Sequence, residues 1–414
     1  MKYFACPDDR GIFDIFRDTS HYNFGVRAIC TRESHAPPTD SQLTKHLVRM
    51  AAGKIVLALV AVLLAVVVNH VTEIISAPGM LKHVYNHVPG TCRFVPGVEQ
   101  GSEDIALTSS GLAFISSGLL PPGFIFDPVY LSFEKRILAF DFKNPTKGAK
   151  EVQIVPQSVM EDFMPHGISV YEDKSGEVRL FVVNHGKGHK DRVEIFRFDA
   201  DSNSLHHMKS VKHPLLYSLN DIVATGPESF YATNDKYSTG LYGRMAETWL
   251  LIAWSNVVYY SGGEATIVAD SLLYANGVNL SPEGKLVYVA NPATAGVTVY
   301  RRQDDNTLRF SHDIKLHTGV DNIFVDPANG DLWVAAHPKG IHFAIHMQNA
   351  SHPCGSQVLR IQNPAGENPS ITEMFSDDGR AGLWGSSVGC YHNKQLLIGT
   401  VNHRLMHCTV DVPL

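Results

Sequence analysis

Six short apolar segments recur along the chain after residue 90, and this repeat constrains the fold more than any other feature. The segments begin at Gly111, Val178, Ser229, Lys285, Asp331 and Gln395. Each is rich in β-branched or aromatic residues and is bounded by Gly, Pro, Asn or Asp, as β-strands are. A strand repeat of roughly fifty residues is typical of propeller blades, each a four-stranded sheet. We therefore predict an all-β, six-bladed β-propeller over residues 91–414, with a β-sandwich of coincidental spacing as the alternative.

One segment departs from this strand pattern. Residues 244–260 are aromatic and apolar, and they could form a helix followed by a strand.

A pair of polar or small residues precedes each strong strand at nearly the same phase. The pairs are Glu103-Asp104, His166-Gly167, Asn220-Asp221, Asn276-Gly277, Asp321-Asn322 and Ser386-Ser387. In a propeller the innermost strands direct their ends at one central channel, so equivalent positions of different blades converge on the axis. The sequence therefore predicts a ring of oxygen-bearing side chains, although any single pair of this kind is more often a turn cap.

Carboxylates and amide oxygens without thiolates make a site for a hard cation, and Ca²⁺ takes such oxygen ligands. The predicted ligands are Glu103, Asn220, Asn276, Asp321 and Asn322. Zinc would call for clustered Cys and His, and burial of the acidic side chains without a cation would be unfavourable. Asp104 and Asp221 each follow a ligand position, so in extended backbone they point the other way and could bind a second, deeper cation. We expect two calcium ions in the central tunnel.

Two histidines belong to one predicted blade. His166 is the first residue of its pair and so occupies a position expected to face the ring. His185 ends the strong strand of the same predicted blade. One imidazole can take a proton from water near neutral pH, and a second can pass it on. The predicted reaction is the attack of water activated by His166, with His185 as its relay, on an ester or lactone carbonyl polarised by calcium. No Ser-based elbow of the Gly-x-Ser-x-Gly kind stands at a predicted strand-to-helix junction, so a covalent acyl-enzyme is not favoured.

The N-terminal part of the chain differs from the repeat region. Residues 55–68 form an unbroken apolar run, which suits a signal-peptide core or signal anchor over residues 50–75, with a buried core helix as the alternative. Residues 1–49 are polar and irregular, and we interpret them as a leader or a gene-model extension. These features predict entry into the secretory pathway, with a membrane-anchored or secreted catalytic domain.

The cysteines fit that compartment. Cys92 and Cys408 bracket the predicted propeller, so they either form a disulfide that closes the ring or are two unrelated buried thiols. Asn349-Ala-Ser351 is an N-glycosylation acceptor sequence. The formal net charge of −6 argues against a nucleic-acid partner.

The chain from about Thr91 to Cys408 resembles the serum paraoxonase and arylesterase family. The matching segments include GSEDIAL from Gly101, PHGIS from Pro165, LNDIVA from Leu219 and VDNIFVDPANGDLWVAAHP from Val320. The resemblance covers about three quarters of the chain and nearly all of the predicted propeller.

The resemblance implies roles for individual residues. The five ring ligands would hold a catalytic calcium, while Asp104, Asp221 and the backbone carbonyl of Ile168 would hold a structural one. His166 and His185 match the histidine pair of the family, and Cys92 with Cys408 match its disulfide. The residues expected to contact the substrate are Leu119, Tyr274, Ser387 and Val401.

The resemblance also implies a function. The expected activity is hydrolysis of lactones and aryl esters, with organophosphate triesters as promiscuous substrates, and the N-terminal helix is expected to attach to a membrane or lipoprotein surface. The alternative is a non-catalytic, membrane-tethered adaptor or chaperone that keeps calcium for folding. A sugar lactonase of the gluconolactonase kind would share the architecture but should lack the two histidines. Departures from the family fall in the substrate wall, at 119–121, Ala336 and 341–344.

Overall fold

The computed structural model describes residues 40–76, 79, 82–120, 126–187 and 190–413. The chain forms two compact units, residues 1–69 and residues 70–414. Most of the predicted leader, with Cys6 and Cys30, lies outside the described residues, and so does Pro121 of the predicted substrate wall.

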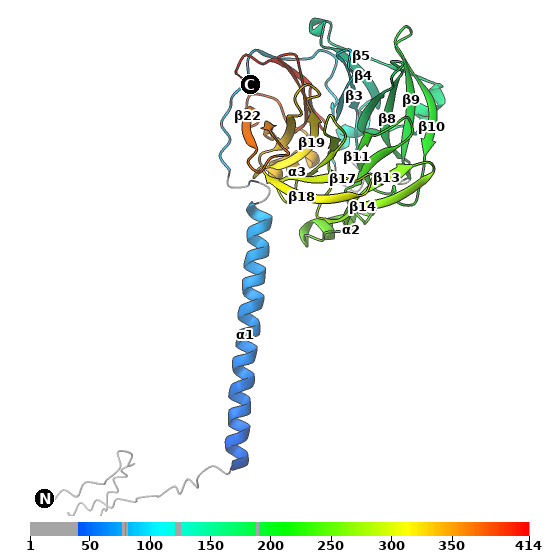
Figure 1. The fold of residues 1–414 in the computed structure, drawn as a ribbon. Helices are drawn as coiled ribbons and strands as arrows, with labels where there is room; N and C mark the ends of the chain where they lie inside the picture. Colours follow the sequence, from blue (N-terminus) through cyan, green and yellow to red (C-terminus); the bar gives the residue numbers. More distant parts are fainter. Residues whose placement is uncertain (1–39, 77–78, 80–81, 121–125, 188–189, 414) are drawn as a thin grey trace, which may run out of the picture. The chain divides into compact units, whose positions relative to one another are not determined.

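The second unit is a six-bladed propeller (Figure 1), as predicted. The first three blades each run outward from the channel in chain order. Blade one contains β2 (Ile105–Leu107), β3 (Leu112–Ser117), β4 (Arg136–Asp141) and β5 (Ala149–Glu151). Blade two contains β7 (Pro165–Glu172), β8 (Val178–Gly186), β9 (Lys190–Asp199) and β10 (Ser204–Val211), with β6 (Gln153–Val155) at its outer edge. Blade three contains β11 (Leu219–Ala224), β12 (Phe230–Asn234), β13 (Ser255–Ser261) and β14 (Glu264–Leu272).

The remaining three blades repeat this order and close the ring. Blade four contains β15 (Val278–Leu280), β16 (Leu286–Asn291), β17 (Gly296–Arg302) and β18 (Leu308–Lys315). Blade five contains β19 (Gly319–Val325), β20 (Leu332–His337), β21 (Ser356–Gln362) and β22 (Ser370–Asp377). Blade six contains β23 (Ser386–His392), β24 (Gln395–Thr400), β25 (Met406–Thr409) and β1 (Cys92–Phe94). The innermost strands β2, β7, β11, β15, β19 and β23 lie against one another in sequence, and β23 returns to β2.

Apolar side chains between blades hold the ring together. The six strong segments predicted from sequence become the second strands of the blades, and their alternate side chains fill the layers between neighbouring sheets. Phe114 of blade one packs with Leu180 and Phe196 of blade two in one such core. Trp333 of blade five stacks on Tyr391 of blade six, with ring centres 4.5 Å apart. Each blade therefore depends on its neighbours for burial.

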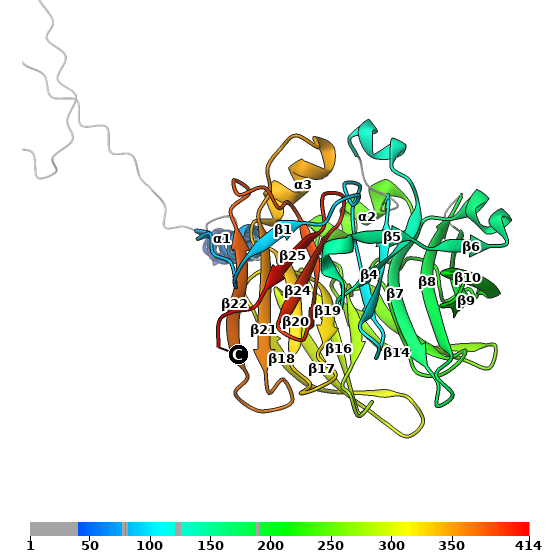
Figure 2. The same cartoon turned by 90° about the horizontal axis from the view of Figure 1, so that it is seen from above.

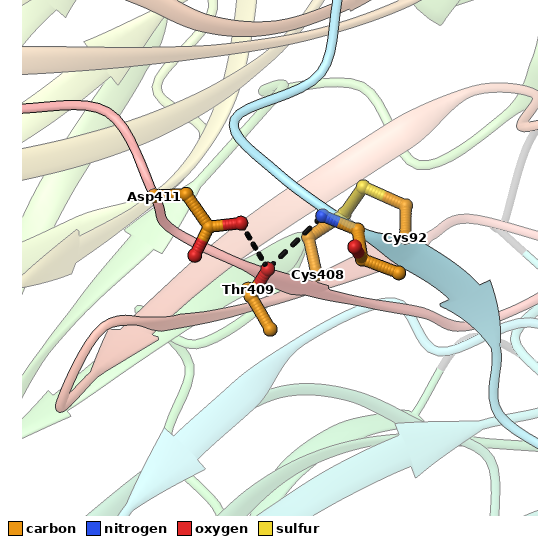
Figure 3. Close-up of a disulfide and its surroundings, with 5 residues drawn as sticks. Cys92, Cys408, Thr409 and Asp411 are labelled. Atoms are coloured by element: carbon orange, nitrogen blue, oxygen red, sulfur yellow. Dashed lines mark hydrogen bonds between the residues drawn. A yellow bond between two sulfur atoms is a disulfide. The ribbon is translucent and has the colours of Figure 1, made fainter.

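The two ends of the propeller meet in blade six, where β1 lies beside β25 (Figure 2). Cys92 and Cys408 face each other in this pairing and form the disulfide between residues separated by 316 positions. The backbone amide of Thr91 donates to Thr409 Oγ1 at 3.0 Å, and Thr409 lies beside the disulfide (Figure 3). The structure thus favours ring closure over two unrelated thiols. Of the described cysteines, Cys354 and Cys390 are free and buried.

Helix α1 (Asp40–Ser76) supplies all described residues of the first unit, and it is longer at its N-terminal end than the predicted segment 50–75. The predicted apolar run is preceded by Leu, Lys, Arg, Met and Ala residues that favour helix, so the helix extends beyond it. Residues 47–69 of α1 are long and apolar enough to cross a membrane. At 1.5 Å per residue they span about 35 Å, against a hydrocarbon thickness of about 30 Å. The apolar run over residues 55–68 therefore underestimates the length of the segment that could cross a membrane.

Two α-helices interrupt the propeller loops. Helix α2 (Leu241–Trp249), followed by β13, confirms the helix and strand predicted over 244–260. Helix α3 (Gly340–Gln348) was not predicted, since its nine residues are a mixture of His, Phe, Ile and Met without a clear polar face. Three short 3₁₀ helices, η1 (Pro128–Ser132), η2 (Pro145–Lys147) and η3 (Gln157–Asp162), complete the described elements.

Candidate functional site

The five predicted calcium ligands are all buried at the ends where innermost strands begin. Glu103 precedes β2, Asn220 lies in β11, Asn276 precedes β15, and Asp321 and Asn322 lie in β19. Asn322 Nδ2 donates to Glu103 Oε1 at 2.9 Å, which directly joins ligand positions of blades five and one. The ladder register shifts at these positions in blades three and five, between Leu219 and Ile222 and between Val320 and Ile323. Such bulges release residues from regular pairing and re-aim their side chains.

Four oxygens of this ring are buried and have no hydrogen-bond partner among the described residues. They are Glu103 Oε2, Asn220 Oδ1, Asn276 Oδ1 and Asn322 Oδ1. Buried polar atoms nearly always find a hydrogen-bond partner. Four unpaired acceptors on residues predicted to bind the same ion therefore require an explanation. A hard cation such as Ca²⁺ would satisfy all four, because it takes carboxylate and amide oxygens together. The residues present therefore fit the implied ion.

The composition of the ring also disfavours a transition metal. The ring has only Glu103 and Asp321 as carboxylates, and its other oxygens come from amides. Softer metals prefer imidazole or thiolate ligands, so this donor set suits calcium better than zinc.

Glycines at two ring positions allow the innermost strands to approach closely. A Cβ atom at Gly167 would lie 2.5 Å from Asp221 Cα, and one at Gly277 would lie 2.6 Å from Asn322 Cα. Any side chain at either position would push neighbouring blades apart. These contacts explain why the second position of the pair is glycine in blades two and four, where blades one and three carry Asp104 and Asp221.

Asp104 and Asp221, the predicted ligands of the second cation, each join two successive blades. Asp104 Oδ2 accepts from the Ile168 amide at 2.7 Å, and Asp221 Oδ2 accepts from the Val278 amide at 2.7 Å. Burial raises the pKa of Asp104 to about 7, and the charge of Glu103 adds to the effect. Burial, followed by the charge of Asp104, raises the pKa of Asp221 well above its usual value. A nearby cation would stabilise the ionised form of both carboxylates. The role of the Ile168 backbone carbonyl stays a prediction.

These pKa shifts predict a pH-dependent effect of calcium removal. A carboxyl whose pKa is raised by folding adds stability below its unfolded pKa of about 4, and this stability is lost as pH rises through the folded value. In excess EDTA, the melting temperature of the full chain should therefore fall between about pH 5 and about pH 8. Saturating calcium should prevent the fall, because the ionised carboxylates then have a cation. A melting-temperature difference between the two conditions that stays constant with pH would contradict this reading.

The predicted histidine pair forms a direct hydrogen bond. His166 Nδ1 lies 2.8 Å from His185 Nε2, and both side chains are buried. His166 Nε2 lies 3.5 Å from Glu103 Oε1, so the pair extends from the ring of ligands into blade two. Burial lowers the pKa of His166, but the charges of Glu103, Asp235 and Asp321 outweigh it and leave the pKa above its usual value. The pair is thus placed to move a proton at the channel.

Two further residues at the site escaped the sequence analysis. His185 Nδ1 lies 3.0 Å from Asp191 Oδ1, and His337 Nε2 lies 3.0 Å from Asp321 Oδ2. His337 is the last residue of β20 and His185 is the last but one of β8, so the blade repeat could have identified His337. Asp191 carries no such signal, because it meets His185 only through the register of β8 with β9.

Two of the four predicted substrate contacts lie in an apolar cluster, and the other two make polar or cation–π contacts. Leu119 and Val401 pack together with Met347 of α3 in one buried cluster. Ser387 Oγ donates to the Glu103 carbonyl at 2.6 Å, so it supports a ligand position from blade six. Tyr274 lies two residues before Asn276, with Lys236 Nζ 4.2 Å above its ring centre. Their contact with a substrate remains a prediction.

Comparison with known proteins places this arrangement in a family. The family model described as Arylesterase matches residues 84–410. The chain is 40% identical to serum paraoxonase/arylesterase 1 of Mus musculus over 359 residues, which cover 86% of this chain and 99% of that protein. It is 42% identical to serum paraoxonase/arylesterase 2 of Homo sapiens over 318 residues, 77% of this chain and 88% of that protein. The matched region contains the ring, the histidine pair and both disulfide cysteines, and the chain belongs to the arylesterase family.

Proposed function

We propose that this protein is a calcium-dependent hydrolase of lactones and aryl esters. The observation that carries the proposal is the group of four unpaired buried oxygens beside the hydrogen-bonded pair of His166 and His185. Membership in the arylesterase family and the names of the relatives, paraoxonase and arylesterase, support the same reaction class.

The ring residues would hold the ion that the reaction needs. Glu103, Asn220, Asn276, Asp321 and Asn322 would bind one calcium, and Asp104 with Asp221 and the Ile168 carbonyl would bind a second. The bound ion supplies Lewis-acid stabilisation of negative charge on the carbonyl oxygen. His337 donates a hydrogen bond to Asp321 and fixes the orientation of that carboxylate.

The histidine pair performs the proton transfer. His166 lies at the ring and takes a proton from the attacking water, and its short hydrogen bond to His185 spreads the resulting charge into blade two. Both imidazoles are buried, so the proton remains within the pair until the leaving group accepts it. The apolar cluster of Leu119, Met347 and Val401 would keep bulk water away and contact the organic part of the substrate.

The remaining features fit a secretory, lipid-associated enzyme. Residues 47–69 of α1 would attach the protein to a membrane or lipoprotein surface. The disulfide between Cys92 and Cys408 is typical of an oxidising compartment. Asn349 is exposed after α3, where an oligosaccharide could be attached.

A substrate panel on the purified full chain tests the proposal. Phenyl acetate, a δ-lactone and an organophosphate triester would be assayed in saturating calcium, after EDTA, and after calcium is restored. We expect the lactone and aryl ester to be turned over, the triester to be slower, and EDTA to abolish all activity reversibly. A folded protein that binds calcium but hydrolyses none of them would instead favour the adaptor function.

A further inference from the structure

We propose that Asp191 is a positioning residue that determines which ring nitrogens of the histidine pair carry protons. It would leave His166 Nε2 as the proton acceptor that faces the ring. The inference rests on the proposed function, because it specifies how the pair becomes a general base. It concerns a side chain of blade two that touches neither the ring nor the substrate wall in the described structure.

The two oxygens of Asp191 are both engaged. Oδ1 lies 3.0 Å from His185 Nδ1, and Oδ2 accepts from the backbone amide of Leu219 at 2.9 Å. The side chain is buried, and the pairing of β8 with β9 places it directly opposite His185. Leu219 precedes the predicted ligand Asn220, so the same carboxylate links the histidine pair to the strand that carries part of the ring. Its position is therefore fixed from two sides.

The direction of the hydrogen bonds follows from chemistry. An ionised carboxylate only accepts hydrogen bonds, and each neutral imidazole has one donor and one acceptor nitrogen. His185 must therefore carry its proton on Nδ1, toward Asp191, which leaves its Nε2 as an acceptor. That acceptor lies 2.8 Å from His166 Nδ1, so His166 carries its proton on Nδ1 as well. His166 Nε2 is then left with a lone pair.

The resulting acceptor is placed where a proton donor is needed. His166 Nε2 lies 3.5 Å from Glu103 Oε1, and two acceptors so close repel each other unless a cation or a hydrogen-bond donor lies beside them. A bound cation would attract the Glu103 carboxylate, and a water molecule could donate to His166. Asp191 thus sets up a base at the ring from two residues away along a hydrogen-bond chain.

Asp191→Asn reverses this arrangement with little change in shape. Leu219 N–H requires an acceptor, so the amide oxygen of the new Asn would face Leu219 and its NH₂ group would donate to His185 Nδ1. The order of donors then inverts along the pair, and His166 Nε2 carries a proton and cannot take one from water. We expect kcat for phenyl acetate and the δ-lactone to fall about 10²–10⁴-fold, with KM and calcium affinity within about threefold of wild type.

Glu194→Gln is the matched control. Glu194 is a buried acidic residue of the same strand and accepts hydrogen bonds from Arg192, Asn184 and Ser210, but none from the histidine pair. This variant should lose thermal stability while its kcat stays within about threefold. Equal kcat losses in Asp191→Asn and Glu194→Gln would overturn the proposal, since both would then reflect general damage to β9.

A second measurement depends neither on Asp191→Asn nor on enzyme activity. Two-bond ¹H–¹⁵N correlation spectra of the full chain, labelled with ¹⁵N-histidine and loaded with calcium, report the tautomer of each imidazole. Signals would be assigned with His166→Gln and His185→Gln. Both residues should carry the proton on Nδ1, and a wild-type His185 protonated on Nε2 alone would overturn the proposal. Because this spectrum needs no substrate, it separates failure of this inference from failure of the proposed esterase function.

Discussion

Asp321→Asn is expected to lower calcium-dependent turnover of phenyl acetate and the δ-lactone by at least about 10³-fold. The ring has two carboxylates, Glu103 and Asp321, and its other oxygens are neutral amides. Neutralising one of the two removes much of the charge that attracts the cation, while Asn keeps the size of the side chain and an oxygen that can still accept from His337. The loss should therefore come from the cation and not from altered packing.

The Asp321→Asn variant should also lose thermal stability relative to wild type, but only when calcium is present. Burial raises the pKa of Asp321, so an ionised Asp321 is unfavourable in the folded protein unless a cation is present. In saturating calcium the variant should melt below wild type, and in EDTA the two should melt at similar temperatures or the variant slightly higher. Thermal melts in both conditions measure this difference.

Asp331→Asn is the control from the same blade. Asp331 is buried in an ion pair with Arg360, with Nη2 to Oδ2 at 2.6 Å. Its loss should destabilise the propeller in both calcium and EDTA, yet leave turnover by the folded fraction close to wild type. Full calcium-dependent turnover in Asp321→Asn would show that the reactive centre lies elsewhere.

His166→Gln should lose about 10²–10⁴-fold in kcat without losing calcium. The glutamine amide fills a similar volume but cannot take a proton from water near neutral pH. Because His166 is not among the predicted ligands, calcium affinity and the melting temperature in calcium should stay close to wild type. Steady-state kinetics and calcium titration of the same preparation check both parts.

His207→Gln provides the comparison within blade two. His207 lies in β10, where Nε2 is 2.8 Å from Glu194 Oε2, and it does not contact the pair. Its replacement should leave kcat within about threefold. Unchanged lactonase rates in His166→Gln would remove the general-base role and leave water activation to another group.

The strand repeat predicted the propeller because it reflects a physical requirement that each blade meets separately. A four-stranded sheet with two buried faces needs an apolar second strand, so the pattern recurs at Gly111, Val178 and the other starts. The polar pairs before these strands could be predicted for the same reason, since equivalent positions face one channel. The Cys92–Cys408 disulfide implied by the family resemblance is confirmed, because β1 pairs with β25 and brings the two cysteines together.

The features that the sequence did not predict depend on contacts between side chains of different helices, strands and loops. Helix α3 has no regular polar face, because Met347 packs toward Leu119 while His346 bonds to Asn402. Asp191 gains its partner through strand register, where a shift of one residue would turn its side chain to the other face. Individual residues of such networks become visible only when the strands are paired in space.

Calcium content is the measurement that bears most directly on the account as a whole. The full chain would be passed through gel filtration in calcium-free buffer, and the metal retained per protomer would be counted by atomic emission. We expect two calcium ions in the wild type and one in Asp321→Asn, because only the site that includes Asp321 loses a charge. Wild-type protein that retains no calcium, or equal calcium in both proteins, would contradict a shared ion at the centre of the propeller.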